Sequence, residues 1–211
     1  MNKPESKSRM KHGRVIFPAA RSAIAINEGL ISEWHADEME GGKNFPSEKA
    51  GEFPPPFESD IASDVPPADD YILSGGETDA RECVNFTNQE MSQKLGRQFT
   101  WPLLDVNAGQ TFLVKWEYAE PHMTRGYSWF ITKDGWDPEK RINRAQLESE
   151  PFYKDFYTQV PYWDHSATLK AKTEHEVKLP SGKQGHHVIV LLWIIANTGN
   201  AFYQAFDVKF K

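Results

Sequence analysis

The sequence predicts an all-β sandwich, and three stretches of the chain carry this prediction. Residues 111–118, TFLVKWEY, alternate between apolar and polar side chains, which is typical of a strand with one buried face. Residues 187–195, HVIVLLWII, form a continuous apolar run, as expected of a strand buried on both faces. Residues 201–210 alternate again, with large apolar side chains on one face. Because little of the chain carries a helical period, these strands favour packed sheets.

The N-terminal part of the chain predicts few regular elements. Residues 1–11 are polar and predict a disordered tail or the remnant of a leader, which leaves 12–211 as a single domain. GRVIFP at 13–18 predicts a first strand that ends at its proline. Residues 19–45 have no steady period, so we expect an excursion with short helical turns. Residues 46–70 are dense in proline and acidic residues, which predicts a long loop between the first strands.

Two further elements are expected between the central strands. YSWFITK at 127–133 predicts a strand, and Asp134 and Gly135 predict the turn that closes it. Residues 141–150, RINRAQLESE, predict a short helix. The chain contains no internal repeat, so one sandwich accounts for all of these elements.

The composition excludes several classes of function. The formal net charge is −6, so a nucleic-acid partner is not expected, because phosphate binding leaves a basic footprint. The longest apolar run, 188–196, is far short of the ~20 residues that a membrane-spanning helix needs. The first residues also lack the apolar core of a signal peptide. The single cysteine, Cys83, cannot form an intrachain disulfide and is expected to be a small buried side chain.

Aromatic residues and histidines are the candidates for chemistry. Aromatics make up 13% of the chain, which suits either a sandwich core or a surface that stacks on sugar rings. The sequence contains no nucleophile elbow, P-loop, dinucleotide fingerprint or HExxH motif. Carboxylates are plentiful, but no spacing singles out a glycosidase pair. The seven histidines are therefore the main candidates.

Most of the histidines fit structural or surface roles. His186 and His187 are neighbours on a predicted strand, where their side chains point to opposite faces and are expected to be structural. Polar loop contexts predict solvated surface side chains for three others: His35, His165 and His175.

His12 and His122 remain, and each alone fits an ordinary surface residue. His122 follows a predicted strand beside a proline, at a loop of the kind where sandwiches place binding residues. If the two strands lie side by side, the two imidazoles can share a metal. Were His12 the first residue, its α-amine would add a third nitrogen, since the pKa of such an amine is about 7.7–8.0. Three nitrogens in a plane suit copper(II).

Four blocks of sequence resemble one known family. HGRVIFPAARS at 12–22, MEGGKNFP at 39–46, SWFITKDGWDP at 128–138 and ANTGNAFYQAFDV at 196–208 occur in the order of bacterial chitin-binding proteins. These proteins are the copper-dependent lytic polysaccharide monooxygenases of auxiliary activity family ten. The resemblance implies an immunoglobulin- or fibronectin-III-like β-sandwich with a long loop region between the first strands. It also implies a secreted protein, although no signal peptide is visible in this sequence.

The resemblance assigns roles to individual residues. His12 and His122 resemble the two copper-binding histidines. Phe202 matches the aromatic residue on the axial side of the copper, and Glu40 matches the acid beside it. Ala119 matches the small residue near the open axial side, although it lies three residues before His122 where the family has two.

The resemblance also implies a substrate surface and a reaction. Trp34 falls where the family carries an exposed aromatic residue on a flat substrate surface. The implied reaction is an oxidative cleavage of glycosidic bonds in crystalline polysaccharide, in which reduced copper activates oxygen or peroxide. The implied partners are the polysaccharide and a small-molecule or protein reductant, and the protein is expected to be a monomer.

Three functional hypotheses stay open from the sequence. The first is a copper monooxygenase acting on chitin, with cellulose as the other substrate. The second is a non-catalytic carbohydrate-binding protein of the same fold, because eleven residues precede His12. The third is a plain interaction module, which leaves His12, His122 and the block around Phe202 without a role.

Overall fold

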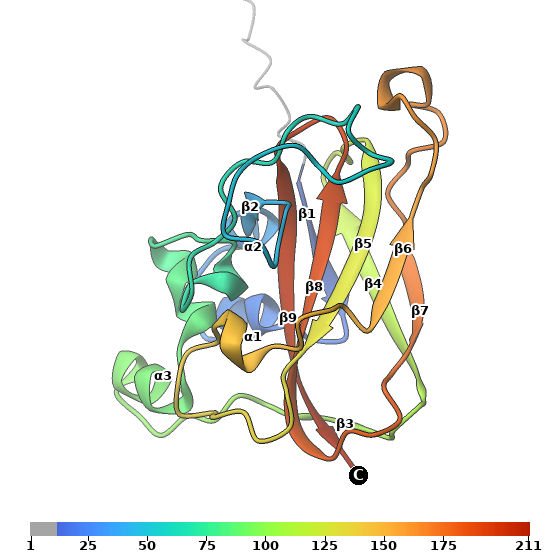
Figure 1. Ribbon diagram of the computed structural model, residues 1–211. Helices are drawn as coiled ribbons and strands as arrows, with labels where there is room; N and C mark the ends of the chain where they lie inside the picture. Colours follow the sequence, from blue (N-terminus) through green and yellow to red (C-terminus); the bar gives the residue numbers. More distant parts are fainter. Residues whose placement is uncertain (1–11) are drawn as a thin grey trace, which may run out of the picture.

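The predicted all-β sandwich is confirmed by the computed structural model, which describes residues 12–211. Two sheets pack face to face, and short helices and loops cover the outer face of one of them (Figure 1). The expected tail at 1–11 lies outside the described residues.

The smaller sheet carries the first predicted strand. Its order is β1-β4-β7, with β1 at Gly13–Phe17, β4 at Thr111–Tyr118 and β7 at Glu174–Lys178. β1 and β4 are antiparallel, and Gly13 lies opposite Tyr118. A Cβ at position 13 would lie 2.5 Å from a ring carbon of Tyr118, so only glycine allows the strands to approach here. This pairing brings the start of β1 to the end of β4.

The larger sheet runs in the order β2-β9-β8-β5-β6, and β3 also pairs with β9. Its strands, in that order, are β2 at Glu40–Gly42, β9 at Asn200–Phe210, β8 at Gly185–Ile195, β5 at Thr124–Ile131, β6 at Tyr153–Phe156 and β3 at Leu104–Val106. β8 and β9 form a long antiparallel hairpin. One end of this hairpin, around 195–202, lies near the start of β1, and the C terminus lies at the opposite end (Figure 1).

The core between the sheets is built largely from aromatic side chains. Trp116 of β4, Trp129 of β5 and Trp193 of β8 are all buried there. Phe202 and Phe206 of β9 belong to the same cluster, as the alternation at 201–210 predicted. The opposite face of β9 is also buried, because helices and loops cover it. The alternation therefore marks two different buried faces and not one buried and one exposed face.

The excursion at 19–45 contains short helices, as expected. These helices are α1 at Arg21–Asn27 and α2 at Glu33–Asp37. A further α-helix, α3 at Asn88–Leu95, follows later in the chain. Short 3₁₀ helical turns occur at Ile72–Ser74, Ala80–Asn85, Arg144–Gln146 and Tyr162–Asp164. The helix predicted over 141–150 is reduced to one of these turns, because the flanking residues run extended and Thr132 bridges Leu147.

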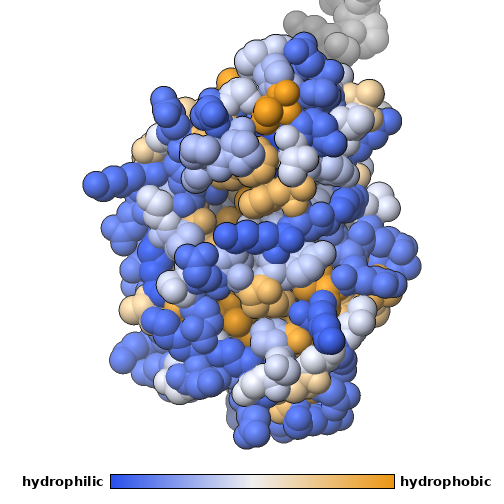
Figure 2. All heavy atoms as spheres, turned by 45° about the vertical axis from the view of Figure 1, so that its right-hand side comes forward, coloured by the Kyte–Doolittle hydropathy of each residue, from blue (hydrophilic) through white to orange (hydrophobic). Residues whose placement is uncertain are grey.

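The loop at 46–70 has no helix or named strand, as its proline content predicted. It is nevertheless anchored, since Phe53, Phe57 and Asp60 are buried. The carboxylate of Asp60 forms two hydrogen bonds with the guanidinium of Arg125 on β5. Elsewhere, hydrophilic side chains dominate the face drawn in Figure 2, with apolar residues in small separate patches.

Candidate metal centre

His12 lies directly before β1, at the end of the smaller sheet. Its main-chain carbonyl accepts a hydrogen bond from the N–H of Ala119 at 2.9 Å, which fixes it beside the end of β4. The His12 side chain is 13% exposed, and its Nε2 lies 3.3 Å from Oε1 of Glu38. Its Nδ1 is buried and has no hydrogen-bond partner among residues 12–211. A buried imidazole nitrogen without a partner fits a metal ligand.

Burial lowers the pKa of His12, and the charge of Asp37 opposes that shift. The ring is therefore neutral at neutral pH. A neutral imidazole keeps a lone pair on one nitrogen, which is the form that binds metals.

His122 lies in the loop between β4 and β5. The end of this loop is held by two main-chain hydrogen bonds, both at 2.8 Å. The N–H of Ala196 donates to the carbonyl of Met123, and the N–H of Thr124 donates to the carbonyl of Leu169. The ring centroid of His122 lies 6.1 Å from that of Trp193.

Phe202 connects the two histidines. Its ring centroid lies 5.7 Å from that of His12, in an edge-to-face arrangement, and 5.9 Å from that of His122. Phe202 is itself fully buried and stacks on Trp193 at 4.7 Å. The structure thus brings together His12, His122 and Phe202, which are remote in sequence.

The two imidazoles fit a nitrogen-rich metal site that takes further donors from outside their side chains. Within residues 12–211, no group of three or more His, Cys, Asp or Glu side chains is arranged to hold a metal ion. An imidazole pair completed by an amine is a donor set that suits copper(II).

Glu40 lies on β2, directly opposite Phe202 on β9. Its Oε1 accepts a hydrogen bond from Nδ2 of Asn200 at 3.0 Å. Burial raises the pKa of the Glu40 carboxyl, and the hydrogen bond from Asn200 opposes that shift. The next residue, Gly41, leaves no room for a Cβ, which would lie 2.2 Å from the carbonyl of Gly75. Glu40 is therefore positioned by a tightly packed strand next to the aromatic residue that both histidines contact.

Ala119 and Trp34 lie on segments that adjoin His12 or the strand that follows it. Ala119 is exposed and joins His12 through the main-chain hydrogen bond already described. Trp34 lies on α2 and is 48% exposed. Asp37 of the same helix accepts a hydrogen bond from Arg14 of β1 at 2.8 Å, which ties α2 to the strand that follows His12.

A family model described as lytic polysaccharide mono-oxygenase, cellulose-degrading, matches residues 12–208. The chain belongs to this family. The match begins at His12, and the expected immunoglobulin- or fibronectin-like sandwich of these monooxygenases is confirmed by the fold.

Individual members of the monooxygenase family are similar to this chain. A solved chitin-binding domain from Burkholderia pseudomallei is 37% identical, with a TM-score of 0.87, and the match covers 96% of this chain and all of that one. An AA10 family lytic polysaccharide monooxygenase C from Mycosarcoma maydis is 30% identical over 94% of this chain and 52% of the relative. A GlcNAc-binding protein A from Shewanella oneidensis is 25% identical over 98% of this chain and 37% of the relative. The chain thus spans about half or less of the length of these two curated relatives.

The structure corrects one expectation about the histidines of this family member. His175 was expected on the surface, but it lies on β7 and is 5% exposed. Its ring packs against Tyr127 with centroids 4.1 Å apart. The alternation of His175 with Val177 and Leu179 carried the signal for an inward-facing position. His35 and His165 are partly exposed, in line with surface positions.

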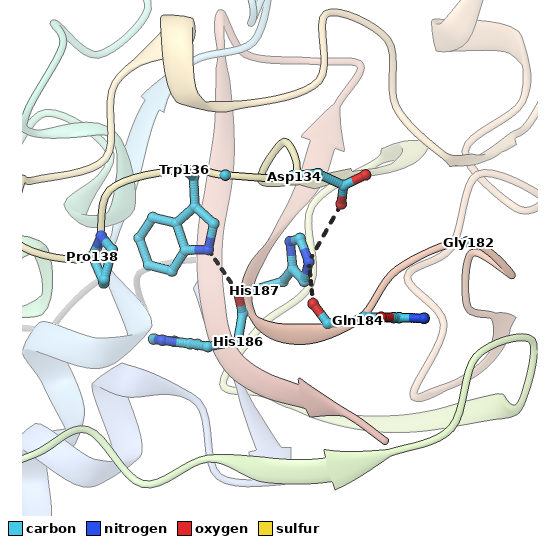
Figure 3. Close-up of a pocket in the computed structure, with 8 residues that line it drawn as sticks. Asp134, Trp136, Pro138, Gly182, Gln184, His186 and His187 are labelled. Carbon is cyan, nitrogen blue, oxygen red and sulfur yellow. Dashed lines mark hydrogen bonds and ion pairs between the residues drawn. The ribbon is translucent and has the colours of Figure 1, made fainter.

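His186 and His187 line a hollow that also includes Trp136 (Figure 3). The two rings point in different directions, as expected for neighbours on a strand. Nε2 of His186 lies 2.9 Å from Oδ1 of Asp207, and Nδ1 of His187 lies 3.0 Å from the hydroxyl of Thr132. Both histidines therefore have structural partners.

Neither Glu38 nor Trp163 is among the residues predicted from the sequence. Glu38 approaches His12, and burial raises the pKa of its carboxyl. Trp163 is 57% exposed, in a loop whose continuation at Leu169 bonds Thr124 near His122. The sequence offers one signal for an exposed Trp163, which is that this tryptophan stands in a polar stretch. Cys83 is buried as expected, and burial raises the pKa of its thiol to about 11.

The described residues contain no helix that is long and apolar enough to cross a membrane.

Proposed function

We propose that residues 12–211 form a single monooxygenase domain that cleaves glycosidic bonds of crystalline chitin oxidatively with copper. The observation that carries this proposal is the packing of His12 and His122 on one buried ring, that of Phe202. The family match supports the class of reaction.

In this proposal, His12 and His122 hold the copper through ring nitrogens. The unpartnered Nδ1 of His12 is the ring atom available for it. A chain that begins at His12 would add its α-amine, which is a peptide nitrogen while Lys11 precedes it. When bound, copper supplies the one-electron redox chemistry that amino-acid side chains lack.

Three other residues shape the surroundings of the histidines. Phe202 fills one side with an apolar ring and excludes water from it. Glu40 has a carboxyl whose pKa is raised by burial, so it keeps its proton to a higher pH than an exposed acid does. Ala119 is small and exposed, which leaves room for a polymer chain to approach.

The substrate proposed is chitin, with cellulose second. A relative of known structure is titled a chitin-binding domain and a curated one is named for GlcNAc binding, whereas the family description mentions cellulose. Trp34 and Trp163 are exposed aromatic side chains of the type that stacks on sugar rings. The proposed protein is a secreted monomer that takes electrons from a small-molecule or protein reductant.

A second candidate is a carbohydrate-binding protein of the same fold without catalysis. It is favoured by the names of relatives that refer only to binding. It also fits a chain in which the nitrogen of His12 stays in a peptide bond with Lys11.

The two candidates are separated by the products released from β-chitin. The copper-loaded protein is incubated with a reductant, once as the full chain and once trimmed to begin at His12. The proposal predicts oxidised chito-oligosaccharides from the trimmed form, detected by mass spectrometry. His122→Ala should abolish them with the fold intact, and His165→Ala is the matched control. If neither form yields oxidised products from chitin or cellulose, the oxidative proposal is wrong and binding alone remains.

A further inference from the structure

The loop that follows β2 closes a second pocket, on the outer face of the larger sheet. Residues from 43–57 form one wall, and β5, β6 and the residues before β6 form the other. The pocket has a volume of about 580 Å³, which lies within the range of small-molecule sites. It faces away from the intersheet core that contains Phe202, because Ile194 lines it while Trp193 faces the core.

The walls of this pocket are aromatic. Phe45, Phe53, Phe57, Phe130 and Phe156 all line it. Phe45 meets Phe130 edge to face at 5.0 Å, and Phe57 meets Phe156 in the same way at 5.5 Å. A flat aromatic ligand would extend this pattern of ring contacts.

Ser128 places a hydroxyl group in this apolar wall. The residue is 5% exposed and lines the pocket from β5. A ligand with a polar atom here would form a hydrogen bond with this hydroxyl inside an otherwise apolar wall.

Asn44 supplies a second polar atom. Its Nδ2 donates to the carbonyls of Gly51 and Glu52, at 3.3 and 3.4 Å, so the other atom of the amide is an acceptor. That atom, Oδ1, is buried without a partner among the described residues. An acceptor of this kind calls for a ligand that donates a hydrogen bond.

The charges around the pocket favour a neutral ligand. Nζ of Lys43 is already bonded to the carbonyls of Ile195 and Thr198, at 2.7 and 2.8 Å. At the mouth, Lys154 lies 3.6 Å from Glu150, so the two exposed charges offset each other.

We propose that this pocket binds a neutral phenol of one or two rings. The aromatic walls hold the ring, and the hydroxyl of the ligand bonds to Ser128 or Asn44. The proposal is independent of the copper chemistry above, since no residue of the histidine pair takes part.

The test uses the full chain, with 4-ethylphenol as probe and its methyl ether, 4-ethylanisole, as the analogue that cannot donate. Binding is followed by NMR through the methyl signals of Ile194, which lines the pocket, with those of buried Ile189 on the other face as reference. We expect saturable shifts at Ile194 and about tenfold weaker binding of the ether.

Ser128→Ala should bring the affinities for 4-ethylphenol and 4-ethylanisole closer together. Ser181→Ala, at an exposed serine, should leave the ratio of these affinities unchanged. The absence of saturable shifts at Ile194 would overturn the proposal. So would shifts confined to other parts of the protein, or an ether that binds as tightly as the phenol.

Discussion

Asp60 and Arg125 form a bidentate ion pair whose side chains are both fully buried. Nε and Nη2 of Arg125 donate to the two carboxylate oxygens at 2.8 and 2.7 Å. The remaining donor group of Arg125 bonds to the carbonyls of Tyr157 and Gln159. The pair joins the long loop to β5, the strand that follows His122, and so supports the loop on the larger sheet.

Replacing Asp60 tests this support. Asp60→Ala leaves the guanidinium of Arg125 buried without its counter-ion, and we expect the free energy of unfolding to fall by about 3–5 kcal/mol. Denaturant titration measures the loss. The exposed pair of Lys115 and Glu174 provides the control, since Glu174→Ala should cost at most about 1 kcal/mol. Equal effects of the two substitutions would contradict a structural role for the buried pair.

His175 predicts how stability changes with pH. Burial lowers the pKa of His175 to about 4, against a usual value of 6.5, and Asp155 opposes that shift. The unfolded chain therefore takes up a proton at this residue before the folded chain does. The contribution of His175 to the free energy of unfolding is fully present above pH 6.5. It falls as the pH drops from 6.5 to about 4, by roughly 3 kcal/mol in all.

His175→Phe removes this titration together with a buried Nε2 that has no partner among the described residues. We expect stability near pH 7 to change little and its fall between pH 6.5 and 4 to become shallower. NMR titration of the His175 ring in the parent protein checks the cause directly. A midpoint near 6.5 would contradict the account.

Glu40 is expected to act on the reaction and not on metal binding. Glu40→Gln keeps an acceptor for Asn200 but removes the titrating proton, so oxidative turnover should fall by about a hundredfold. Copper affinity, measured by calorimetry, should be unchanged. Glu139→Gln changes an exposed carboxylate and serves as the control. A Glu40 variant with full turnover would remove this residue from the site.

Trp34 is expected to contribute to binding of the polymer. Trp34→Ala removes an exposed ring and should weaken adsorption to β-chitin by about three- to tenfold, as binding isotherms would measure. Phe17 is similarly exposed, at 50%, but lies at the far end of β1, so Phe17→Ala should bind like the parent. If both variants bind equally well, the ring of Trp34 is not on the substrate surface.

The strands could be predicted because their patterns are local. The alternation at 111–118 and the apolar run at 187–195 each lie within one strand, and the structure has both. The polar neighbours of His175 predict an exposed side chain, whereas its alternation with Val177 agrees with its burial. The burial of Asp60 could not be predicted, since its partner Arg125 is 65 residues away and no local pattern links them.

The pairing of His12 with His122 could be predicted only in part. Each histidine alone looked like a surface residue, and only the resemblance connected them. Their proximity depends on β1 pairing with β4 and on Phe202 reaching both rings from β9. Such pairing is a property of the whole sandwich, which explains why spacing in the sequence did not reveal it.

The central claim is that His12, through its ring and its amine, and His122 together hold copper. Calorimetry of copper(II) binding to the chain trimmed at His12 and to the full chain tests it most directly. The amine exists only in the trimmed chain, so we expect that chain to bind copper much more tightly, and His122→Ala to weaken it. Equal affinities of the two chains would contradict the claim.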